Sequence, residues 1–453
     1  MSIKNTHFSS EEIGNFFDSA KKIFFIGIGG VSMSSLATHC HFLGKEIFGY
    51  DSQMTDATKH LESFAYIKYS STPDSTCGVD LVIYSNAIDE ENFEYKQAKK
   101  LKIPTLSRAN FLSYVLSRYK NSIGIAGSHG KSTTTSFLTK ILDYAHLNPA
   151  VFCGAKMKGY DRAFLWGQNE YILAEACEYM DSFLCLTPKL CGITNIEYDH
   201  PDYFKSEEEY LCSFKKFISR CGRVVLGIDT PLAGRAYREL DCKDKITTFS
   251  QRDKEADYFA RERNDGFVLY RGGKRVLASP LNFRGAHYVE NATCASIIAL
   301  ESGISPATVS KALEESYGVY RRLEFIKKSD TGADIFEDYA HHPTEIKATL
   351  TSLLKMGYKR VLCFFQPHTF SRTHFLYDGF LSAFSLAHKS YILPTFKARE
   401  KNEYGVSEAE LARGCGAEYL ENYESLKEII SKSECDCVVL MGAGDIYKLK
   451  KYL

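Results

Sequence analysis

The sequence predicts an α/β protein of three domains, and three observations support this prediction. Short apolar runs recur along the 453 residues, each ending in glycine or polar residues and most leading into a helical stretch. This alternation is typical of βαβ units around a largely parallel sheet. The length exceeds what one hydrophobic core can organise, and about 150 residues per domain gives about three domains. Two separate glycine turns, at 27–30 and 127–130, each connect a predicted strand to a predicted helix.

Composition narrows the class of ligand. The chain carries 56 basic and 56 acidic residues, without the excess of basic charge expected of a protein that binds a nucleic-acid backbone or an anionic membrane. We therefore expect small-molecule partners, with no nucleic acid and no membrane.

The 14 cysteines form no CxxC pair, and several stand in apolar runs as reduced thiols do. Together with a polar N-terminus and the lack of an apolar run of about 18 residues, this favours a cytoplasmic protein.

The first region begins with a βαβ pattern and a glycine turn. Gly27, Gly29 and Ser32 nearly match the G-x-G-x-x-G fingerprint of dinucleotide sites, and Asp51 stands where a ribose-binding acid is expected. The same turn and helix N-terminus can hold any diphosphate, including that of a UDP-sugar. A nicotinamide dehydrogenase and a UDP-sugar site therefore both remain open at this point.

The central region opens on a candidate phosphate loop with the spacing G-x-x-G-K-S. Its backbone N–H groups can surround phosphate oxygens, Lys131 can reach the terminal phosphates, and Ser132 can offer a hydroxyl to Mg²⁺. The common P-loop has a further glycine where Ile125 stands. A glycine-serine turn with a solvated lysine is the alternative interpretation.

Two further predicted strands in this region end in polar residues. Glu175, Glu178 and Asp181 follow the run 171–174, and the run 191–194 precedes Asn195, Glu197, Asp199 and His200. Ligands of an open parallel sheet collect at the carboxyl ends of its strands, so these groups and the phosphate loop indicate one Mg-nucleotide site. Glu175 suits Mg²⁺, which prefers oxygen ligands, whereas a histidine is a less usual ligand.

The rest of the chain predicts hairpins on the edge of the central sheet and a third α/β region. Glycine-punctuated β-rich sequence at 245–283 predicts antiparallel hairpins on the edge of the central sheet. His287 and Asn291, four residues apart, share a face of the next predicted helix. In the third unit, Pro343 suits the first position of a helix. The preceding His341-His342 is a poor metal pair, because adjacent residues point to different sides and the sequence offers no obvious third ligand.

Taken in order, the motifs resemble one family over nearly the whole chain. GIGGVSM, AGSHGKSTTT, EACE, TNIEYDH, G-x-H-x₃-N, RRLEF, EDYAHHPTEI, FQPHTFSRT and GAGDI stand at intervals similar to those of the Mur ligases of bacterial cell-wall synthesis. Within the family the likeness is greatest to the branch that acts on UDP-N-acetylmuramate and L-alanine. Three departures stand out: Ser132 replaces a threonine, Tyr288 an asparagine, and Thr369 an arginine.

The resemblance implies the architecture of the chain. It gives an N-terminal Rossmann-like domain for the UDP-sugar at 1–120 and a central P-loop ATPase-like domain, with a parallel sheet and edge hairpins, at 121–320. A C-terminal Rossmann-like domain for the amino acid follows at 321–453.

The resemblance also implies the site residues. The ATP-binding residues are Gly127, Ser128, His129, Gly130, Lys131, Ser132, Thr133, His287, Asn291 and Arg322. Ser132, Glu175 and His200 would hold Mg²⁺, as two ions, and Lys131, Glu175 and His200 would be catalytic. The UDP-sugar would contact Gly27, Gly29, Gly30, Ser32, Asp51 and Ser85. L-alanine would contact Tyr339, His341, His368 and Arg372.

The implied reaction is ATP-dependent formation of an amide. A carboxylate is a poor electrophile, so the family first converts the lactoyl carboxylate of UDP-N-acetylmuramate into an acyl phosphate. The amine of L-alanine then attacks to give a tetrahedral intermediate that expels phosphate.

We expect a monomer or weak homodimer. The alternatives are a ligase that attaches a recycled peptide to the same sugar, a nicotinamide dehydrogenase, and a catalytically silent UDP-sugar-binding protein, which the intact Lys131, Ser132, Glu175 and His200 argue against.

Overall fold

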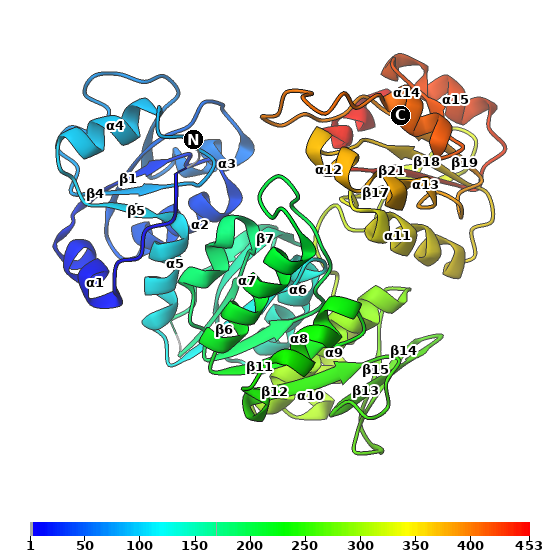
Figure 1. Cartoon of the computed structure of the whole chain (residues 1–453), viewed down its shortest axis with the longest axis horizontal. Helices are drawn as coiled ribbons and strands as arrows, with labels where there is room; N and C mark the ends of the chain where they lie inside the picture. Colours follow the sequence, from blue (N-terminus) through cyan, green and yellow to red (C-terminus); the bar gives the residue numbers. More distant parts are fainter. Residues whose placement is uncertain (1–2, 169) are drawn as a thin grey trace.

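The computed structural model describes residues 3–168 and 170–453, which fold around three separate sheets (Figure 1). The N-terminal sheet has the strand order β3-β2-β1-β4-β5, and all its pairs are parallel. Its strands are β1 (Lys22–Ile26), β2 (Glu46–Tyr50), β3 (Ala65–Lys68), β4 (Leu81–Tyr84) and β5 (Thr105–Ser107). The accompanying helices are α1 (Ser10–Ser19), α2 (Val31–Phe42), α3 (Asp56–Leu61), α4 (Phe93–Lys100) and α5 (Arg108–Ser117).

The central sheet has ten strands in the order β15-β14-β13-β12-β11-β10-β6-β9-β7-β8. They are β6 (Asn121–Ala126), β7 (Ala150–Met157), β8 (Arg162–Leu165), β9 (Tyr171–Glu175), β10 (Leu190–Ile193), β11 (Arg223–Gly227), β12 (Ile246–Ser250), β13 (Tyr258–Arg263), β14 (Gly266–Arg271) and β15 (Lys274–Pro280). Its helices are α6 (Lys131–Tyr144), η1 (Tyr179–Cys185), α7 (Glu207–Arg220), α8 (Pro231–Glu239), η2 (Lys243–Lys245), α9 (Ala286–Glu301) and α10 (Pro306–Glu314). The predicted edge hairpins are confirmed for β13 to β15, whereas β12 joins the parallel part beside β11.

The C-terminal sheet has the order β16-β17-β21-β18-β19-β20 and is parallel except for the β16–β17 pair. Its strands are β16 (Glu324–Lys328), β17 (Asp334–Asp338), β18 (Val361–Phe365), β19 (Lys389–Ile392), β20 (Glu418–Tyr419) and β21 (Cys437–Met441). The helices are α11 (Pro343–Lys355), α12 (Phe370–Phe375), α13 (Tyr377–Leu381), α14 (Glu408–Gly414), η3 (Tyr423–Ser425), α15 (Leu426–Lys432) and η4 (Ile446–Tyr452). The last element is a 3₁₀ helix.

Local sequence explains where the helices next to the site begin. Pro343 occupies the first position of α11, as predicted, and the Glu345 side chain accepts the His342 N–H at 3.3 Å in a capping box. Helix α7 follows Ser206, whose hydroxyl accepts the Glu209 N–H at 3.2 Å. Three glutamates in its first turn interact favourably with the positive end of the helix dipole. The central strands β18 and β21 are buried throughout, because parallel sheets are covered on both faces.

The hairpin of β7 and β8 was not predicted. Its sequence lacks a clear apolar alternation. Strand β7 packs on β9 and α6 within the central region, and α2 of the N-terminal region covers part of both strands of the hairpin. Phe152 and Phe164 of the hairpin lie with ring centroids 5.6 and 6.0 Å from the His39 ring. A contact between two regions thus stabilises a hairpin that local pattern does not reveal.

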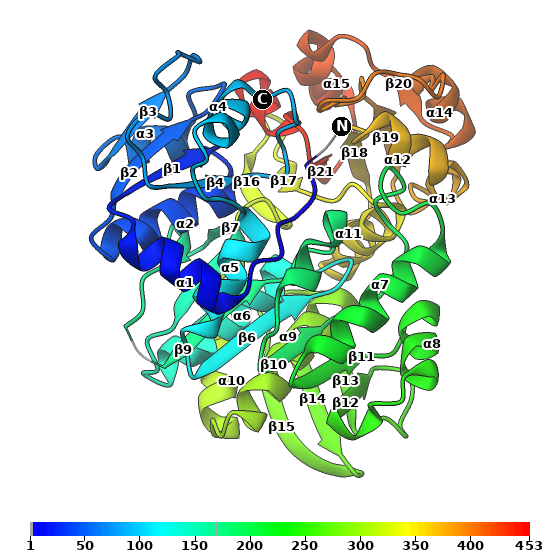
Figure 2. The same ribbon diagram turned by 60° about the vertical axis from the view of Figure 1, so that its left-hand side comes forward.

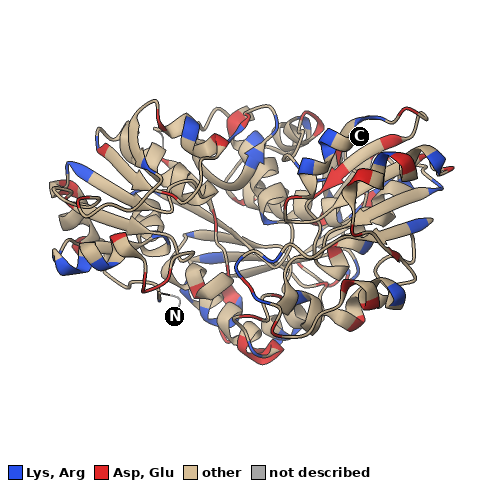
Figure 3. Ribbon diagram, turned by 90° about the horizontal axis from the view of Figure 1, so that it is seen from above, with Lys and Arg blue, Asp and Glu red and all other residues tan. Residues whose placement is uncertain are grey.

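The N- and C-terminal regions form two lobes above the central one (Figures 1 and 2). Direct contacts join all three. Asn86 of the first region donates to the Ser182 hydroxyl at 3.2 Å, and Arg399 of the last donates to the Ala87 carbonyl of the first. Acidic and basic residues are interspersed over all three lobes (Figure 3). No helix in residues 3–168 and 170–453 has the length and apolar character needed to cross a bilayer.

Candidate active site

The loop at 127–130 connects the carboxyl end of β6 to the N-terminus of α6. Gly127 and Gly130 have φ of +128° and +83°, a region that favours glycine. A Cβ at Gly130 would collide with the side chain of Asn291, and one at Gly127 with that of Thr194. The Ser128 and His129 N–H groups donate to the carbonyl and side chain of Asn195, at 3.2 and 2.9 Å, and so fix the loop. The first N–H groups of α6 have no partner within the helix, and with the two glycines beside them they form a cradle that fits phosphate.

Lys131 folds back over this loop. Its Nζ donates to the carbonyls of Gly127 and Ser128, at 2.5 and 3.1 Å, and to both carboxylate oxygens of Glu178, at 3.0 and 2.9 Å. Burial raises the pKa of the Glu178 carboxyl, but the charges of Lys131 and His200 outweigh it and hold that pKa below its ordinary value. The ammonium is thus a buried cation beside the phosphate cradle, paired with an anion.

His200 and Arg372 extend this polar cluster toward the C-terminal region. His200 Nε2 lies 3.5 Å from Glu178 Oε1 and 3.8 Å from Asp199 Oδ2. Arg372 of α12 donates from Nε and Nη2 to the Asp199 carboxylate at 2.9 and 3.3 Å, and both side chains are buried. Burial raises the pKa of the Asp199 carboxyl, but Arg372 lowers it well below its ordinary value. The two residues form a buried ion pair between regions.

Glu175 is the last residue of β9, and Ser132 lies in the first turn of α6, which follows the adjacent strand β6. Cys153 connects them: its Sγ is 3.2 Å from Glu175 Oε1 and 3.8 Å from the Ser132 carbonyl. Glu175 Oε1 also accepts the Gly154 N–H. A carboxylate and a hydroxyl residue beside the phosphate cradle fit a hard cation such as Mg²⁺. His200 is paired with Glu178 here.

A cavity of about 680 Å³ lies beside the phosphate loop at 127–130, and residues of both the central and the C-terminal region line it. Of the residues predicted to bind ATP, His129, Gly130, Thr133, His287, Asn291 and Arg322 line it. Tyr288 also lines it and is buried, with its ring stacked on Phe283 at 4.8 Å. Burial lowers the pKa of His287 to about 4, so that imidazole is neutral at pH 7. Burial raises the pKa of Glu290, another lining residue, to about 8.

His129 of the loop lies between two carboxylates. Its Nε2 is 3.2 Å from Glu197 Oε2, and its Nδ1 is 3.5 Å from Glu345 Oε1. Burial lowers the pKa of His129, but the two carboxylates raise it to about 10 overall. Glu345 also accepts Arg322 Nη1 at 3.0 Å, and Thr344 Oγ1 donates to Glu197 Oε1 at 2.6 Å. Because Thr344 and Glu345 belong to α11, this cluster joins the phosphate loop to the C-terminal region.

The four residues predicted to bind the amino acid lie together. The His341 ring is 5.6 Å from that of Tyr339 and 5.8 Å from that of His368. Arg372 Nη1 donates to the His368 carbonyl at 2.6 Å. Asp199 already occupies the fork of Arg372, so this arginine would bind a substrate carboxylate only after that pair opens.

The residues predicted to hold the UDP-sugar gather at the carboxyl ends of β1, β2 and β4. Asp51 Oδ2 accepts the Gly29 N–H at 2.8 Å, and the Ser32 hydroxyl accepts from Arg108 at 3.2 Å. A Cβ at Gly27 would lie 3.3 Å from that of Ser85. Gly30 caps α2, which begins at Val31.

The structure brings five acids and one histidine into the site for which no individual role was predicted from the sequence, although their position after predicted strands already placed Glu178, Glu197 and Asp199 near the nucleotide. These are Glu178, Glu197, Asp199, Asp338, His342 and Glu345. Asp338 is buried, and burial raises its pKa to about 6. Several of these residues stand inside the motifs EACE, TNIEYDH and EDYAHHPTE. Their position within motifs was the available signal, but only folding shows which basic group each one faces.

Three family models match successive parts of the chain. The Mur ligase family, catalytic domain model matches residues 22–120, and the Mur ligase middle domain model matches residues 125–299. The model of the Mur ligase, glutamate ligase domain matches residues 321–444.

Curated relatives match nearly end to end. The UDP-N-acetylmuramate–L-alanine ligase of Caldicellulosiruptor saccharolyticus is 38% identical over 444 residues, covering 94% of this chain and 97% of the relative. The enzyme of the same name from Acetivibrio thermocellus is 36% identical over 446 residues, covering 95% and 94%.

Solved structures of similar proteins match the chain over most of its length. The crystal structure of the UDP-N-acetylmuramate-alanine ligase of Thermotoga maritima has a TM-score of 0.79 at 26% identity and covers 95% of this chain and 98% of that one. A murein peptide ligase of Psychrobacter arcticus shares the fold with a TM-score of 0.70 at 21% identity, covering 95% and 98%. The resemblance predicted from the motifs is therefore confirmed, and the chain belongs to the Mur ligase family.

Proposed function

We propose that this chain is an ATP-dependent ligase that joins L-alanine to the lactoyl carboxylate of UDP-N-acetylmuramate, releasing ADP and phosphate, in peptidoglycan precursor synthesis. The observation that carries the proposal is the match over more than nine-tenths of the chain to relatives of that name, at up to 38% identity. The geometry supports it, because a glycine cradle, a buried lysine and a nucleotide-sized cavity lie at one sheet edge.

Phosphoryl transfer brings anions together, so the site has to position them and neutralise their charge. We assign Lys131 to the β- and γ-phosphates of ATP and the N–H groups of Gly130, Ser132 and Thr133 to phosphate oxygens. Gly127, Ser128 and His129 would shape the loop around the phosphates, since the Ser128 and His129 N–H groups donate to the carbonyl and side chain of Asn195 at 3.2 and 2.9 Å. His287, Asn291 and Arg322 lie in the cavity beside them and would contact the nucleoside. Glu178 would release Lys131 when phosphate arrives and stay paired with His200.

Ser132 and Glu175 would hold one Mg²⁺, and His200 a second. When bound, the ions supply positive charge between the phosphates. The oxygen donors of Ser132 and Glu175 fit a hard cation. His200 lies close to Lys131, because both side chains contact the carboxylate of Glu178.

Tyr339, His341, His368 and Arg372 would surround L-alanine, and Gly27, Gly29, Gly30, Ser32, Asp51 and Ser85 the UDP-sugar. We propose domain boundaries near residues 120 and 320, in line with the family-model limits of 22–120, 125–299 and 321–444. We also propose a cytoplasmic enzyme acting as a monomer or weak homodimer.

The test is phosphate release from ATP and Mg²⁺ with UDP-N-acetylmuramate and each of four acceptors: L-alanine, glycine, L-serine and the tripeptide L-Ala-γ-D-Glu-meso-diaminopimelate. Preference for L-alanine is the expected result. Turnover with the tripeptide alone would instead assign the chain to peptide recycling, and no turnover with any acceptor would refute the ligase.

A further inference from the structure

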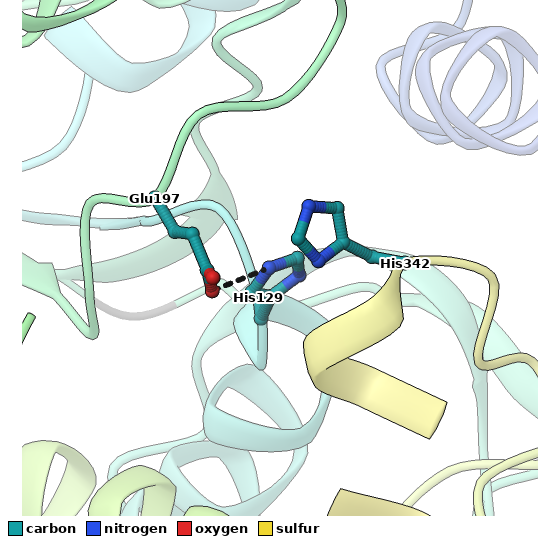
Figure 4. A group of neighbouring side chains, drawn as sticks. All are labelled: His129, Glu197 and His342. Atoms are coloured by element: carbon teal, nitrogen blue, oxygen red, sulfur yellow. Dashed lines mark ion pairs between the residues drawn. The ribbon is translucent and has the colours of Figure 1, made fainter. Parts of the chain in front are cut away.

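We propose that His129, Glu197 and His342 form a binding site for a transition-metal ion of the Zn²⁺ class, separate from the magnesium ligands. One donor atom from each residue lies within 4.8 Å of the other two. Figure 4 shows the three side chains converging from the phosphate loop, the segment after β10 and the start of α11. The adjacent pair His341-His342 did not predict a metal site from the sequence, because no third ligand was evident. In the folded chain, His129 and Glu197 of the central region lie beside His342 and complete a set of three possible metal ligands.

The donor set selects the kind of ion. Two imidazoles and one carboxylate are a known ligand set of zinc sites that keep a fourth position for water or another ligand. Imidazole also suits copper, nickel and cobalt, with affinities that follow the usual order of divalent ions. Mg²⁺ prefers oxygen ligands in an octahedral arrangement, so this site should discriminate against it.

Neighbouring residues already orient two of the ligands. The Glu345 carboxylate lies 3.5 Å from His129 Nδ1, which leaves Nε2 directed to Glu197 at 3.2 Å. A carboxylate on the far nitrogen of a metal-binding histidine is a common arrangement that fixes its tautomer. The Thr344 hydroxyl binds Glu197 Oε1 at 2.6 Å, which leaves Oε2 facing His129. A bound ion would replace the proton on His129 Nε2, since metal ligands are deprotonated.

His342 is a suitable third ligand. It is 4% exposed, and its ring centroid is 4.7 Å from that of His129. Its Nδ1 accepts the Thr344 N–H at 3.3 Å, so the lone pair lies on Nδ1, and its Nε2 has no hydrogen-bond partner within the described part of the chain. A long hydrogen bond of this kind is readily exchanged for a metal bond.

A bound ion would tie the C-terminal region to the phosphate loop. His129 precedes Gly130 and Lys131 in the loop, whereas His342 is the residue on which α11 begins. Metal binding by the protein alone does not depend on whether the proposed reaction is correct.

The test is Co²⁺ and Zn²⁺ binding to the full-length protein without nucleotide. Wild type should bind one Co²⁺ per chain with visible d–d bands of nitrogen and oxygen coordination, and Zn²⁺ should displace it while excess Mg²⁺ should not. His342→Ala and Glu197→Gln should each weaken binding more than 100-fold. Thr344→Val, which removes a hydroxyl that only orients Glu197, should weaken binding about 10–100-fold.

His374→Ala, at an exposed histidine of the same region, is the matched control and should bind like wild type. Circular dichroism checks that each variant is folded. The proposal is overturned if wild type shows only the near-ultraviolet bands of cobalt bound to thiolates. It also fails if folded His342→Ala and Glu197→Gln both bind Zn²⁺ as tightly as wild type.

Discussion

At the residue scale, the lysine of the phosphate loop and its partner acid depend on each other. Lys131 Nζ is held by two carbonyls and by Glu178, a side chain that is 1% exposed. A buried carboxylate that loses its only ammonium partner becomes strongly destabilising. Loss of activity and loss of folding therefore have to be separated when either residue is changed.

We expect Lys131→Ala to lower kcat by at least about 10²–10³-fold, because it removes charge stabilisation at the phosphates. It should also lower the free energy of unfolding by up to about 3–5 kcal/mol, because the buried Glu178 carboxylate loses its ammonium partner and keeps only His200, 3.5 Å away. The double variant Lys131→Ala/Glu178→Gln should recover most of that stability and remain inactive. ADP formation and urea unfolding measure the two effects. Turnover in the double variant would contradict the phosphate role of Lys131.

Glu290 gives the site a pH dependence. Burial raises its pKa from 4.5 to about 8, so the folded protein keeps a proton that the unfolded chain has released. This stability is fully present below about pH 4.5 and is lost as the pH rises through about 8. Relative to Glu290→Gln, wild type should lose about 3 kcal/mol over that window, less than the full shift gives because the side chain is partly exposed. Urea unfolding of the nucleotide-free protein at several pH values measures it, and parallel curves would rule the effect out.

Sequence and structure contribute differently at this scale. Lys131 and Ser132 follow from loop chemistry, because a phosphate site needs those groups at that spacing. The partners of His129 do not, since Glu197 and Glu345 lie far along the chain and meet it only when two regions pack together. Arg372 shows the same limit, because its fork suits a carboxylate in general but the fold directs it to Asp199.

At the scale of elements, the turn from β6 into α6 requires a residue with positive φ and no side chain. Gly130 has φ of +83° and faces Asn291, whereas Gly303 has φ of +85° and open space where a Cβ would stand, with no atom within 4 Å. The two glycines therefore separate backbone strain from a close contact.

Gly303→Ala should destabilise the protein by about 1 kcal/mol, the cost of a left-handed alanine, and leave ATP binding unchanged. Gly130→Ala should cost more and weaken ATP binding at least tenfold, because the new methyl group displaces Asn291 or the loop. Thermal unfolding and equilibrium nucleotide binding compare them. Equal effects of the two substitutions would mean that the contact with Asn291 is unimportant.

Periodicity predicted most parallel strands and the helices that follow them, because those segments are apolar throughout and bounded by glycine or proline. It did not predict the hairpin of β7 and β8, whose Phe152 and Phe164 lie against His39 of α2 in another region. Elements whose burial depends on a distant partner lack a local signature.

At the scale of the whole molecule, several ion pairs join the C-terminal region to the central one, and two of them differ clearly in burial. Asp199 and Arg372 have side chains 4% and 7% exposed, whereas Glu262 and Lys355 are 30% and 41% exposed. Asp199→Asn should lower the free energy of unfolding by about 3–5 kcal/mol, or enlarge the radius of gyration if the region swings away and Arg372 becomes hydrated.

Glu262→Gln is the matched control and should cost less than about 1 kcal/mol, as exposed pairs do. Urea unfolding with small-angle X-ray scattering measures both variants. If both substitutions had the same small effect and neither changed the shape, the buried pair would not hold the regions together.

The contact of Arg399 with the Ala87 carbonyl closes the circle of regions, because the last region then touches the first as well as the central one. Under the proposed function, water that enters such an enclosure would hydrolyse the activated acyl group before the amine attacks. The contact would therefore govern coupling efficiency. The intact enzyme should release one ADP per amide formed, and Arg399→Ala should raise that ratio by wasting nucleotide, while a ratio that stays at one would show that the seal lies elsewhere.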